Sequence, residues 1–375
     1  MDAPAIAIIG GGPCGLTLAR LLECKGIDYL VFERDASEYS NRSGGSLDIH
    51  GETGQQALDE AGLLDEFKRH ARYDDTSFTL SDKLGKRLIH TGQGRDAPEI
   101  DRVELRQLLL DAIPKEKIRW GHTLTGATIG HGNNPSLEFS NGVVLSGFKL
   151  VVGADGAWSK VRSVFTDATP KYSGKTNLES SIDKESPIYD ITASKAGPGT
   201  HVAIGSGKLI VTQRQGNGSY RNYFGIPISE DFFRNSAMDI SGTETIRDLL
   251  LSNFYADWSD EYQNLIRHAT RFRAWPLYTL SVKDMGWKSV PGFTLAGDAA
   301  HLAIPNGEGV NLAMTDSLKL AFKIAEHGTD NLAQAVQEYE ADMFPRAVGT
   351  ISEGKAMLDI MYAEDPQSFL QLLSG

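Results

Sequence analysis

Three glycines near the start of the chain, Gly10, Gly12 and Gly15, form the pattern Gly-x-Gly-x-x-Gly between an apolar run and a helical stretch. Glycines at this spacing allow a tight turn and let the backbone approach a pyrophosphate at a helix N-terminus. Glu33 follows 23 positions after Gly10, close to the separation of about 20 residues expected for an acid that binds a ribose hydroxyl. The motif favours dinucleotide binding over a purely structural glycine turn, but it does not distinguish FAD from NAD.

Two later segments carry acidic groups at the ends of predicted strands. Asp155 lies in the segment Gly153–Gly156 after one strand, and Asp298 follows Gly297 after another. A carboxylate at such a position can accept a hydrogen bond from a ribityl hydroxyl. The segment Pro305–Asn311 begins a helix, and its amide groups can stabilise negative charge at the edge of a flavin ring. Together these groups favour FAD.

Hydrophobic periodicity predicts the elements that position these groups. Buried strands are expected at Ala5–Ile9, Tyr29–Phe32, Leu150–Val152 and Phe293–Ala296, and helices at Cys14–Lys25, 53–72, Val103–Ile113, Gly309–Glu326 and 331–373. Between residues 171 and 274, the alternating stretches Lys208–Thr212 and Tyr220–Ile228 and their glycine turns predict an antiparallel sheet.

The expected fold class is therefore α/β: a Rossmann-like FAD-binding domain with an inserted, mainly antiparallel β-sheet substrate domain and a C-terminal helix. The FAD-binding domain is expected at residues 1–75, 100–170 and 275–330, the sheet domain at 76–99 and 171–274, and the C-terminal helical segment at 331–375.

Composition excludes several other classes of protein. The chain has 375 residues and a formal net charge of −12, so it should repel nucleic acid and anionic membrane surfaces. Two cysteines are too few for a disulfide framework, and no run approaches the about 20 apolar residues of a membrane span. The start of the chain leads directly into a strand instead of a signal peptide. We expect a cytoplasmic monomer with no nucleic-acid or membrane partner, and with no metal, because its histidines do not cluster with acids at ligand spacing.

The glycine triplet, Asp155-Gly156 and Gly297-Asp298 occur in an order and at separations that resemble the single-component (group A) FAD-dependent monooxygenases of the para-hydroxybenzoate hydroxylase fold. Within that group, Gly44–His50, Leu105-Arg106 and Gly153–Arg162 are most similar to the tetracycline-inactivating flavin monooxygenases and their fungal secondary-metabolism relatives. The resemblance covers nearly the whole chain. It implies that the FAD-binding domain is of the para-hydroxybenzoate hydroxylase type.

The resemblance also implies roles for individual residues. Asp48, Arg106 and Asp298 would contact FAD, Glu33 would bind the adenosine ribose, and Asp155 would support the region where NADPH and FAD meet. The complete set of implied cofactor-binding residues is Gly10, Gly12, Gly15, Glu33, Arg34, Gly45, Asp48, Arg106, Asp155, Asp298, Pro305, Gly307, Gly309 and Asn311.

The chain departs from those relatives in two regions. One residue instead of two separates Pro305 from Gly307, so the loop over the flavin should differ in shape. In the sheet domain, Glu179, Lys208 and Tyr223 stand where the tetracycline-inactivating enzymes carry glutamine, arginine and histidine. These three are the predicted substrate residues, and tetracycline is not indicated as the natural substrate.

The tetracycline-inactivating enzymes carry a basic residue shortly before the glycine pair, at a position that aligns with Asn41 here. Arg42 lies one position away, so it is the predicted NADPH contact. His50 and His301 are candidates for a catalytic or proton-relay role, with hydrogen-bonded support of the flavin loops as the alternative. Trp258, Trp275 and Trp287 are expected in the core or between the domains.

The activity implied is an FAD-dependent monooxygenase. NADPH or NADH would reduce the flavin, and O2 would form a flavin C4a-hydroperoxide that transfers one oxygen atom to an aromatic or polycyclic small molecule. A tetracycline-like compound or a secondary metabolite would suit such a site. Two alternatives remain open: an FAD-dependent oxidase or dehydrogenase that needs no NADPH, and a flavin-binding protein without catalysis.

Overall fold

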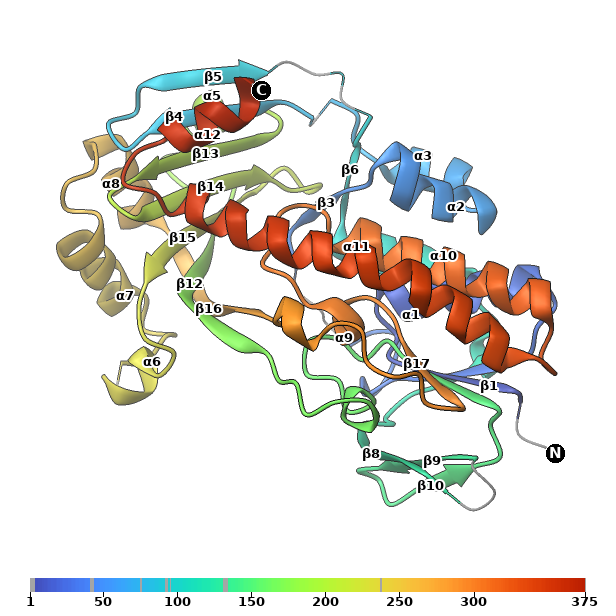
Figure 1. Ribbon diagram of the computed structural model, residues 1–375. Helices are drawn as coiled ribbons and strands as arrows, with labels where there is room; N and C mark the ends of the chain where they lie inside the picture. Colours follow the sequence, from blue (N-terminus) through green and yellow to red (C-terminus); the bar gives the residue numbers. More distant parts are fainter. Residues whose placement is uncertain are drawn as a thin grey trace.

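The protein is described by a computed structural model that places residues 4–40, 44–74, 76–91, 94, 96–130, 134–236 and 238–374. Two large sheets form its framework, and one long helix near the C-terminus, α11 (Leu332–Met361), runs past both (Figure 1). The predicted α/β class with a mainly antiparallel second sheet is confirmed.

A five-stranded parallel sheet carries the glycine motif. Its order is β17 (Phe293–Leu295), β11 (Leu150–Gly153), β1 (Ile6–Ile9), β2 (Tyr29–Phe32) and β7 (Ile118–Arg119). The strands are short and apolar because both faces of the sheet are covered. One face packs against α1 (Pro13–Cys24), α4 (Arg102–Asp111) and α10 (Gly309–His327), and the other against the small sheet of β8 (Leu124–Ile129), β9 (Pro135–Phe139) and β10 (Val144–Ser146).

The turn from β1 into α1 requires glycine at two positions. Gly10 has φ +110°, and a Cβ there would lie 2.3 Å from the carbonyl oxygen of Ala154. A Cβ at Gly15 would lie 2.0 Å from the carbonyl oxygen of Gly10. The first contact holds the turn against β11, and the second presses helix α1 onto the turn.

Seven strands form the second sheet. Their order is β16 (Thr270–Thr279), β12 (Lys171–Ile182), β15 (Tyr220–Pro227), β14 (Lys208–Arg214), β13 (Thr200–Gly205), β4 (Phe78–Asp82) and β5 (Arg87–Thr91). Neighbouring strands are antiparallel except β13 and β4, which are parallel. The strands predicted at Lys208–Thr212 and Tyr220–Ile228 are confirmed.

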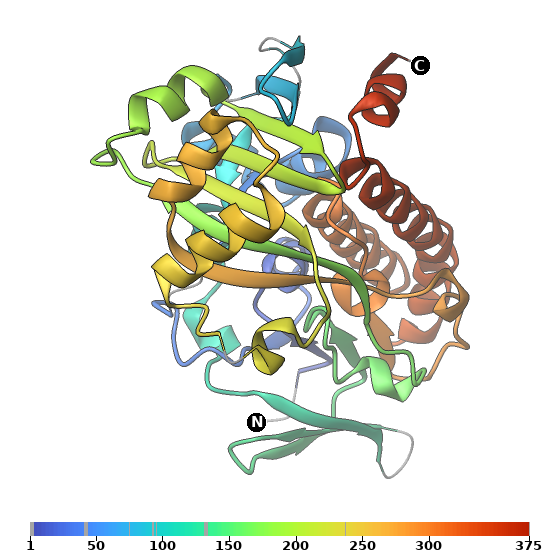
Figure 2. The same cartoon turned by 90° about the vertical axis from the view of Figure 1, so that its left-hand side faces the viewer.

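One face of this sheet is covered by the helices α5 (Tyr189–Ala196), α7 (Thr243–Leu249) and α8 (Asp260–His268) (Figure 2). Its buried side chains include Leu178, Ile210 and Phe224. We call this the outer face. The opposite, inner face is turned toward α11 and the parallel sheet, where Leu209 packs with Ile304.

Helix α11 joins the two sheets. Near its start, the hydroxyl of Tyr339 donates to the carbonyl of Leu295 in β17 at 2.9 Å. Near its end, Ile360 packs with Leu80 and Val202 on the inner face of the large sheet. The same helix therefore contacts both units.

The remaining elements are β3 (Ser46–Asp48), β6 (Glu99–Asp101), α2 (Gln56–Glu60), α3 (Leu64–His70), α6 (Phe232–Asn235), α9 (Asp298–His301) and α12 (Gln367–Ser374), with single 3-10 or π turns at Gly51–Gln55, Lys115–Lys117, Arg162–Val164, Leu250–Phe254 and Val282–Asp284. Strands β3 and β6 pair with each other as a separate two-stranded sheet.

Two predicted helices are divided in the structure. The stretch 53–72 contains α2 and α3, because Gly62 between them has φ +68° and ends the first helix. The stretch 331–373 contains α11 and α12, with Pro366 in the break. The predicted domain boundary between residues 274 and 275 falls inside β16. No helix in the described part of the chain is both long and apolar enough to cross a membrane.

The contact at Gly15 gives a first prediction. Gly15→Ala should lower the free energy of unfolding by about 1–3 kcal/mol, because the added methyl group forces α1 away from the turn. Gly349→Ala in α11 is the control, since its Cβ would meet only the end of the Glu353 side chain, at 4.0 Å. That variant should be neutral or gain up to about 1 kcal/mol. Denaturant unfolding measures both, and equal stability of the two variants would contradict the packing described here.

Candidate active site

The glycine turn is held by the acid predicted to bind ribose. Glu33 is buried at the end of β2, where its Oε2 accepts from the amide of Gly11 at 2.5 Å and its Oε1 from the amide of Asp35 at 2.9 Å. The carboxylate therefore fixes the loop beside which the adenosine end of a dinucleotide would lie. The neighbouring Arg34 is exposed.

Arg106 reaches the same turn from helix α4. Its buried guanidinium donates from Nε to the carbonyl of Gly11 at 3.2 Å, and its Nη2 lies 3.4 Å from Oδ2 of Asp35. The open side of the turn is at Gly12, where a Cβ would meet no described atom within 4 Å. A pyrophosphate could approach the backbone there without displacing protein.

Asp298 and Asp155 follow two neighbouring strands of the parallel sheet. The Asp298 side chain is exposed, yet protein on several sides removes enough water to raise the pKa of its carboxyl. His301, Arg102 and Arg162 oppose that rise. The carboxylate of Asp155 instead accepts from Ser159 Oγ at 2.6 Å and from the amide of Lys160 at 2.7 Å. Asp298 is thus available to a ligand, whereas Asp155 organises its own turn.

His301 lies behind the Asp298 loop. Its Nε2 is 2.6 Å from Oδ2 of the buried Asp316, which also accepts from the amide of Gly297 at 2.9 Å and from Arg346 at 3.0 Å. Burial opposes both charges, but the pair holds the pKa of Asp316 below and that of His301 above their usual values. His301 is buried in this ion pair, an arrangement consistent with the supporting role.

The segment Gly44–His50 and the start of α10 are joined by Asn311. This buried side chain donates to the carbonyl of Asp48 at 3.0 Å and accepts from the amide of His50 at 2.9 Å. Pro305 and Gly307, on the loop before α10, and Gly309, its first residue, are exposed. A Cβ at Gly309, the first residue of α10, would meet no described atom within 4 Å, so there is open space beside the start of this helix.

Polar side chains gather on the inner face of the large sheet, opposite β3. Glu179 and Tyr223 are direct cross-strand neighbours, and Glu179 accepts from the indole of Trp275 at 2.9 Å and lies 3.3 Å from Arg221. A Cβ at Gly45 would lie 2.6 Å from the Tyr223 hydroxyl oxygen and 3.2 Å from Oε1 of Gln213. We call Glu179, Gln213, Arg221, Tyr223 and Trp275 the polar patch.

The structure does not bring Lys208 to this patch. Lys208 begins β14 on the outer face, where its Nζ lies 3.8 Å from Oδ1 of Asp257. Side chains alternate between the faces of a strand, so Leu209 points inward and Lys208 outward. Trp275, expected in packing, is 40% exposed within the patch, whereas Trp258 is buried. Asn41 and Arg42 lie outside the described residues.

Three site residues were not predicted from the sequence. Gln213 and Arg221 pair across β14 and β15 on the inner face, and Arg221 could have been found because it lies two positions before Tyr223. Arg102 begins α4, and its side chain adjoins Gly44 and influences Asp298. No local signal marked Gln213, because its face depends on the register of the sheet.

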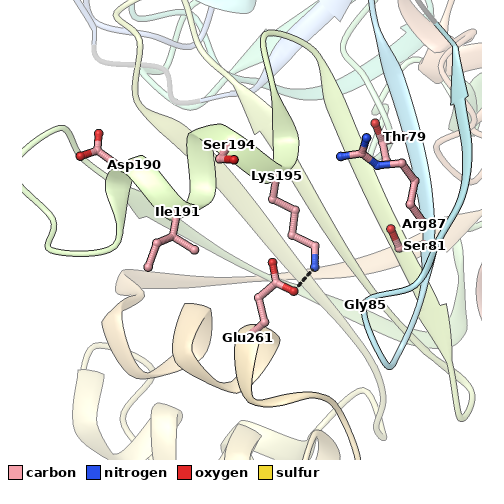
Figure 3. Close-up of a pocket in the computed structure, with 9 residues that line it drawn as sticks. All are labelled: Thr79, Ser81, Gly85, Arg87, Asp190, Ile191, Ser194, Lys195 and Glu261. Atoms are coloured by element: carbon pink, nitrogen blue, oxygen red, sulfur yellow. Dashed lines mark ion pairs between the residues drawn. The ribbon is translucent and has the colours of Figure 1, made fainter.

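A hollow of about 630 Å³ lies elsewhere, on the outer face between α5, α8 and the β4–β5 hairpin (Figure 3). Lys195 and Glu261 form an ion pair within it. The large sheet separates this hollow from Gly45 and the polar patch, so we do not assign the cofactor to it.

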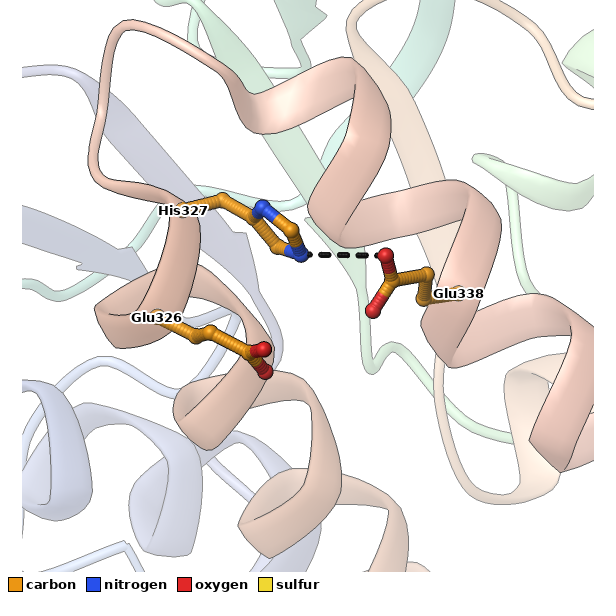
Figure 4. A group of neighbouring side chains, drawn as sticks. All are labelled: Glu326, His327 and Glu338. Atoms are coloured by element: carbon orange, nitrogen blue, oxygen red, sulfur yellow. Dashed lines mark ion pairs between the residues drawn. The ribbon is translucent and has the colours of Figure 1, made fainter.

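One group of described side chains has potential metal ligands close together: Glu326, His327 and Glu338 (Figure 4). His327 Nε2 lies 3.2 Å from Glu338. However, Nζ of Lys323 lies 2.8 Å from Glu326 and 2.7 Å from Glu338. The ammonium group supplies the positive charge there, so the group is an ion-pair cluster on the surface of α10 and α11.

The buried Asp316 gives a second prediction. Asp316→Asn should lower the free energy of unfolding by about 3–5 kcal/mol, because it leaves His301 and Arg346 without their buried counter-charge. Asp342→Asn is the matched control, since exposed Asp342 pairs with the same arginine and should cost about 1 kcal/mol or less. Denaturant unfolding compares them. Equal losses would show that the buried carboxylate is no more important than the exposed one.

Comparison with known proteins agrees with this geometry. The family model described as "FAD binding domain" matches residues 3–353. "Monooxygenase penA" of Penicillium thymicola is 33% identical, and the match covers 91% of both chains. HpxO of Klebsiella pneumoniae, solved with FAD and uric acid, has a TM-score of 0.79 at 21% identity, covering 96% of this chain and 90% of that one. The tetracycline destructase Tet(55) has a TM-score of 0.75 at 20% identity, covering 97% and 91%. The chain therefore belongs to the FAD binding domain family of flavin monooxygenases and has the para-hydroxybenzoate hydroxylase fold.

Proposed function

We propose that the protein is an NAD(P)H-dependent monooxygenase that uses FAD to insert one oxygen atom of O2 into an aromatic or polycyclic small molecule. The observation that carries the proposal is the contact between Tyr223 and Gly45. It brings the polar patch of the large sheet against the segment that carries the predicted flavin residues. A substrate bound to the patch would therefore lie beside the cofactor.

The residues present fit FAD. Gly12 and Gly309 border open space at the starts of α1 and α10, and Asp298 offers an accessible carboxylate after β17. Glu33 would hold the adenosine ribose, with the N-terminus of α1 and Arg106 near the pyrophosphate. Asp298 would accept from the ribityl chain, and the amides at Gly307 and Gly309 would face the ring. When bound, FAD supplies the redox chemistry.

The overall reaction balances as substrate, O2, NAD(P)H and one proton giving oxygenated substrate, NAD(P)+ and water. The chain's part is to bind and orient the substrate and to exclude water from the site. Trp275 offers an exposed aromatic ring on which a planar substrate could stack. Burial raises the pKa of Tyr223, so its protonated hydroxyl can donate to a phenolate, enolate or carbonyl oxygen.

The names of the relatives support this class of reaction. The relative from Penicillium thymicola is called a monooxygenase, and a structural neighbour was solved with uric acid, a polar heterocycle. Tetracycline is included among the compounds to test, because the Tet(55) neighbour shares the fold. The patch here contains Glu179 and Arg221, so a substrate with both donor and acceptor groups would suit it.

The first test measures NADPH and NADH oxidation in air by the FAD-loaded protein. The panel contains simple phenols, uric acid, tetracyclines and polycyclic aromatic metabolites. We expect one compound to accelerate oxidation and to yield a product heavier by one oxygen atom, labelled when heavy-isotope O2 is supplied. Reduction of the flavin by a compound without NAD(P)H would instead indicate an oxidase or dehydrogenase. A flavin that neither reductant nor compound reduces would indicate a non-catalytic protein.

The polar patch gives a further prediction. With the compound so identified, Tyr223→Phe should raise KM about tenfold, since one hydrogen bond to a substrate oxygen is lost. Lys208→Met is the control, because Lys208 lies on the outer face, and its KM should equal that of the wild type. An unchanged KM in Tyr223→Phe, or an equal rise in both variants, would remove Tyr223 from the substrate site.

A further inference from the structure

His50 joins two segments that are far apart in the sequence and flank the proposed flavin site. Its Nε2 lies 3.1 Å from Oδ2 of Asp48 in β3, and its Nδ1 lies 3.2 Å from Oε1 of Glu308 at the start of α10. We call Asp48, His50 and Glu308 the imidazole bridge. Both ring nitrogens face carboxylates of the protein, so neither is left to act on a substrate.

The charges of the bridge explain why a histidine is needed. Two carboxylates approach from different segments, and a cation between them removes their mutual repulsion. The two hydrogen bonds with Asp48 and Glu308 raise the pKa of His50 to about 10. The ring is therefore charged at neutral pH. It is only partly exposed, as are both carboxylates, so solvent screens the interaction incompletely.

The bridge lies beside the groups that FAD would need. Asp48 is a predicted cofactor residue, and a Cβ at Gly307 would lie 3.8 Å from its Oδ2. Glu308 stands between Gly307 and Gly309, whose amides would face the flavin ring. Any separation of β3 from this loop would move both sides of the site.

We propose that His50 is a positioning residue that holds β3 and the Gly307–Gly309 loop at the spacing FAD requires. The proposal rests on the proposed FAD site but not on the reaction or its substrate. Asn311 fixes the backbone of the same junction through neutral hydrogen bonds, so the segment stays folded when the imidazole is removed. The loss then appears in cofactor affinity.

The test measures FAD binding to apoprotein by the quenching of flavin fluorescence, alongside thermal unfolding of each apoprotein. His50→Gln should weaken FAD binding by about tenfold or more, because it leaves Asp48 and Glu308 facing each other. The double variant His50→Gln/Glu308→Gln has the same net charge at the junction as the wild type. It should recover most of the lost affinity.

The control is His70→Gln, which removes a histidine paired with Glu66 on the exposed side of α3 and should not change FAD affinity. Wild-type affinity in His50→Gln would overturn the proposal, as would a double variant no better than the single one. Unchanged affinity with a slower reaction at saturating FAD would assign His50 to the reaction instead. If the variants change FAD affinity as expected but the protein oxidises no compound, the result would count against the proposed function alone.

Discussion

Asp316 carries its charge in the interior of the protein, where an unpaired carboxylate would be very unfavourable. Its partners come from three places: the amide of Gly297 after β17, His301 in α9 and Arg346 in α11. Because Asp316 itself belongs to α10, satisfying this one charge fixes four segments relative to one another. Asp298 and the loop before α10 extend from those segments. Their positions depend on the buried ion pairs behind them.

The large sheet shows how one element can serve two purposes. Its outer face is apolar and covered by helices, so it supplies the core of the second unit. Its inner face divides into an apolar region under α11 and the polar patch opposite β3. The apolar region fixes the position of the sheet, and the polar patch is then available for recognition. Stability and binding are thus carried by adjacent stretches of the same strands.

The sequence allowed prediction of features that depend on local spacing. The Gly10–Gly15 turn, Glu33 at the end of β2 and the strands around Asp155 and Asp298 all follow from short motifs and hydrophobic runs. Features that depend on three-dimensional pairing were less accessible. The sequence predicts Lys208 as a substrate residue. Side chains point alternately to the two faces of β14, however, and that of Lys208 points to the outer face. The pairing of Asp316 with Arg346 joins residues on two helices, and nothing in the local pattern marks it.

Helix α11 has a consequence for how molecules enter the space between the sheets. With 30 residues it is about 45 Å long, and it is anchored to β17 near one end and to the large sheet near the other. A helix fastened to both units opposes hinge rotation between them, although Pro345 inside it removes one backbone hydrogen bond and lowers its stiffness there. Because Asn311 also ties Gly44–His50 to the start of α10, we expect molecules to enter through movements of side chains at the rim.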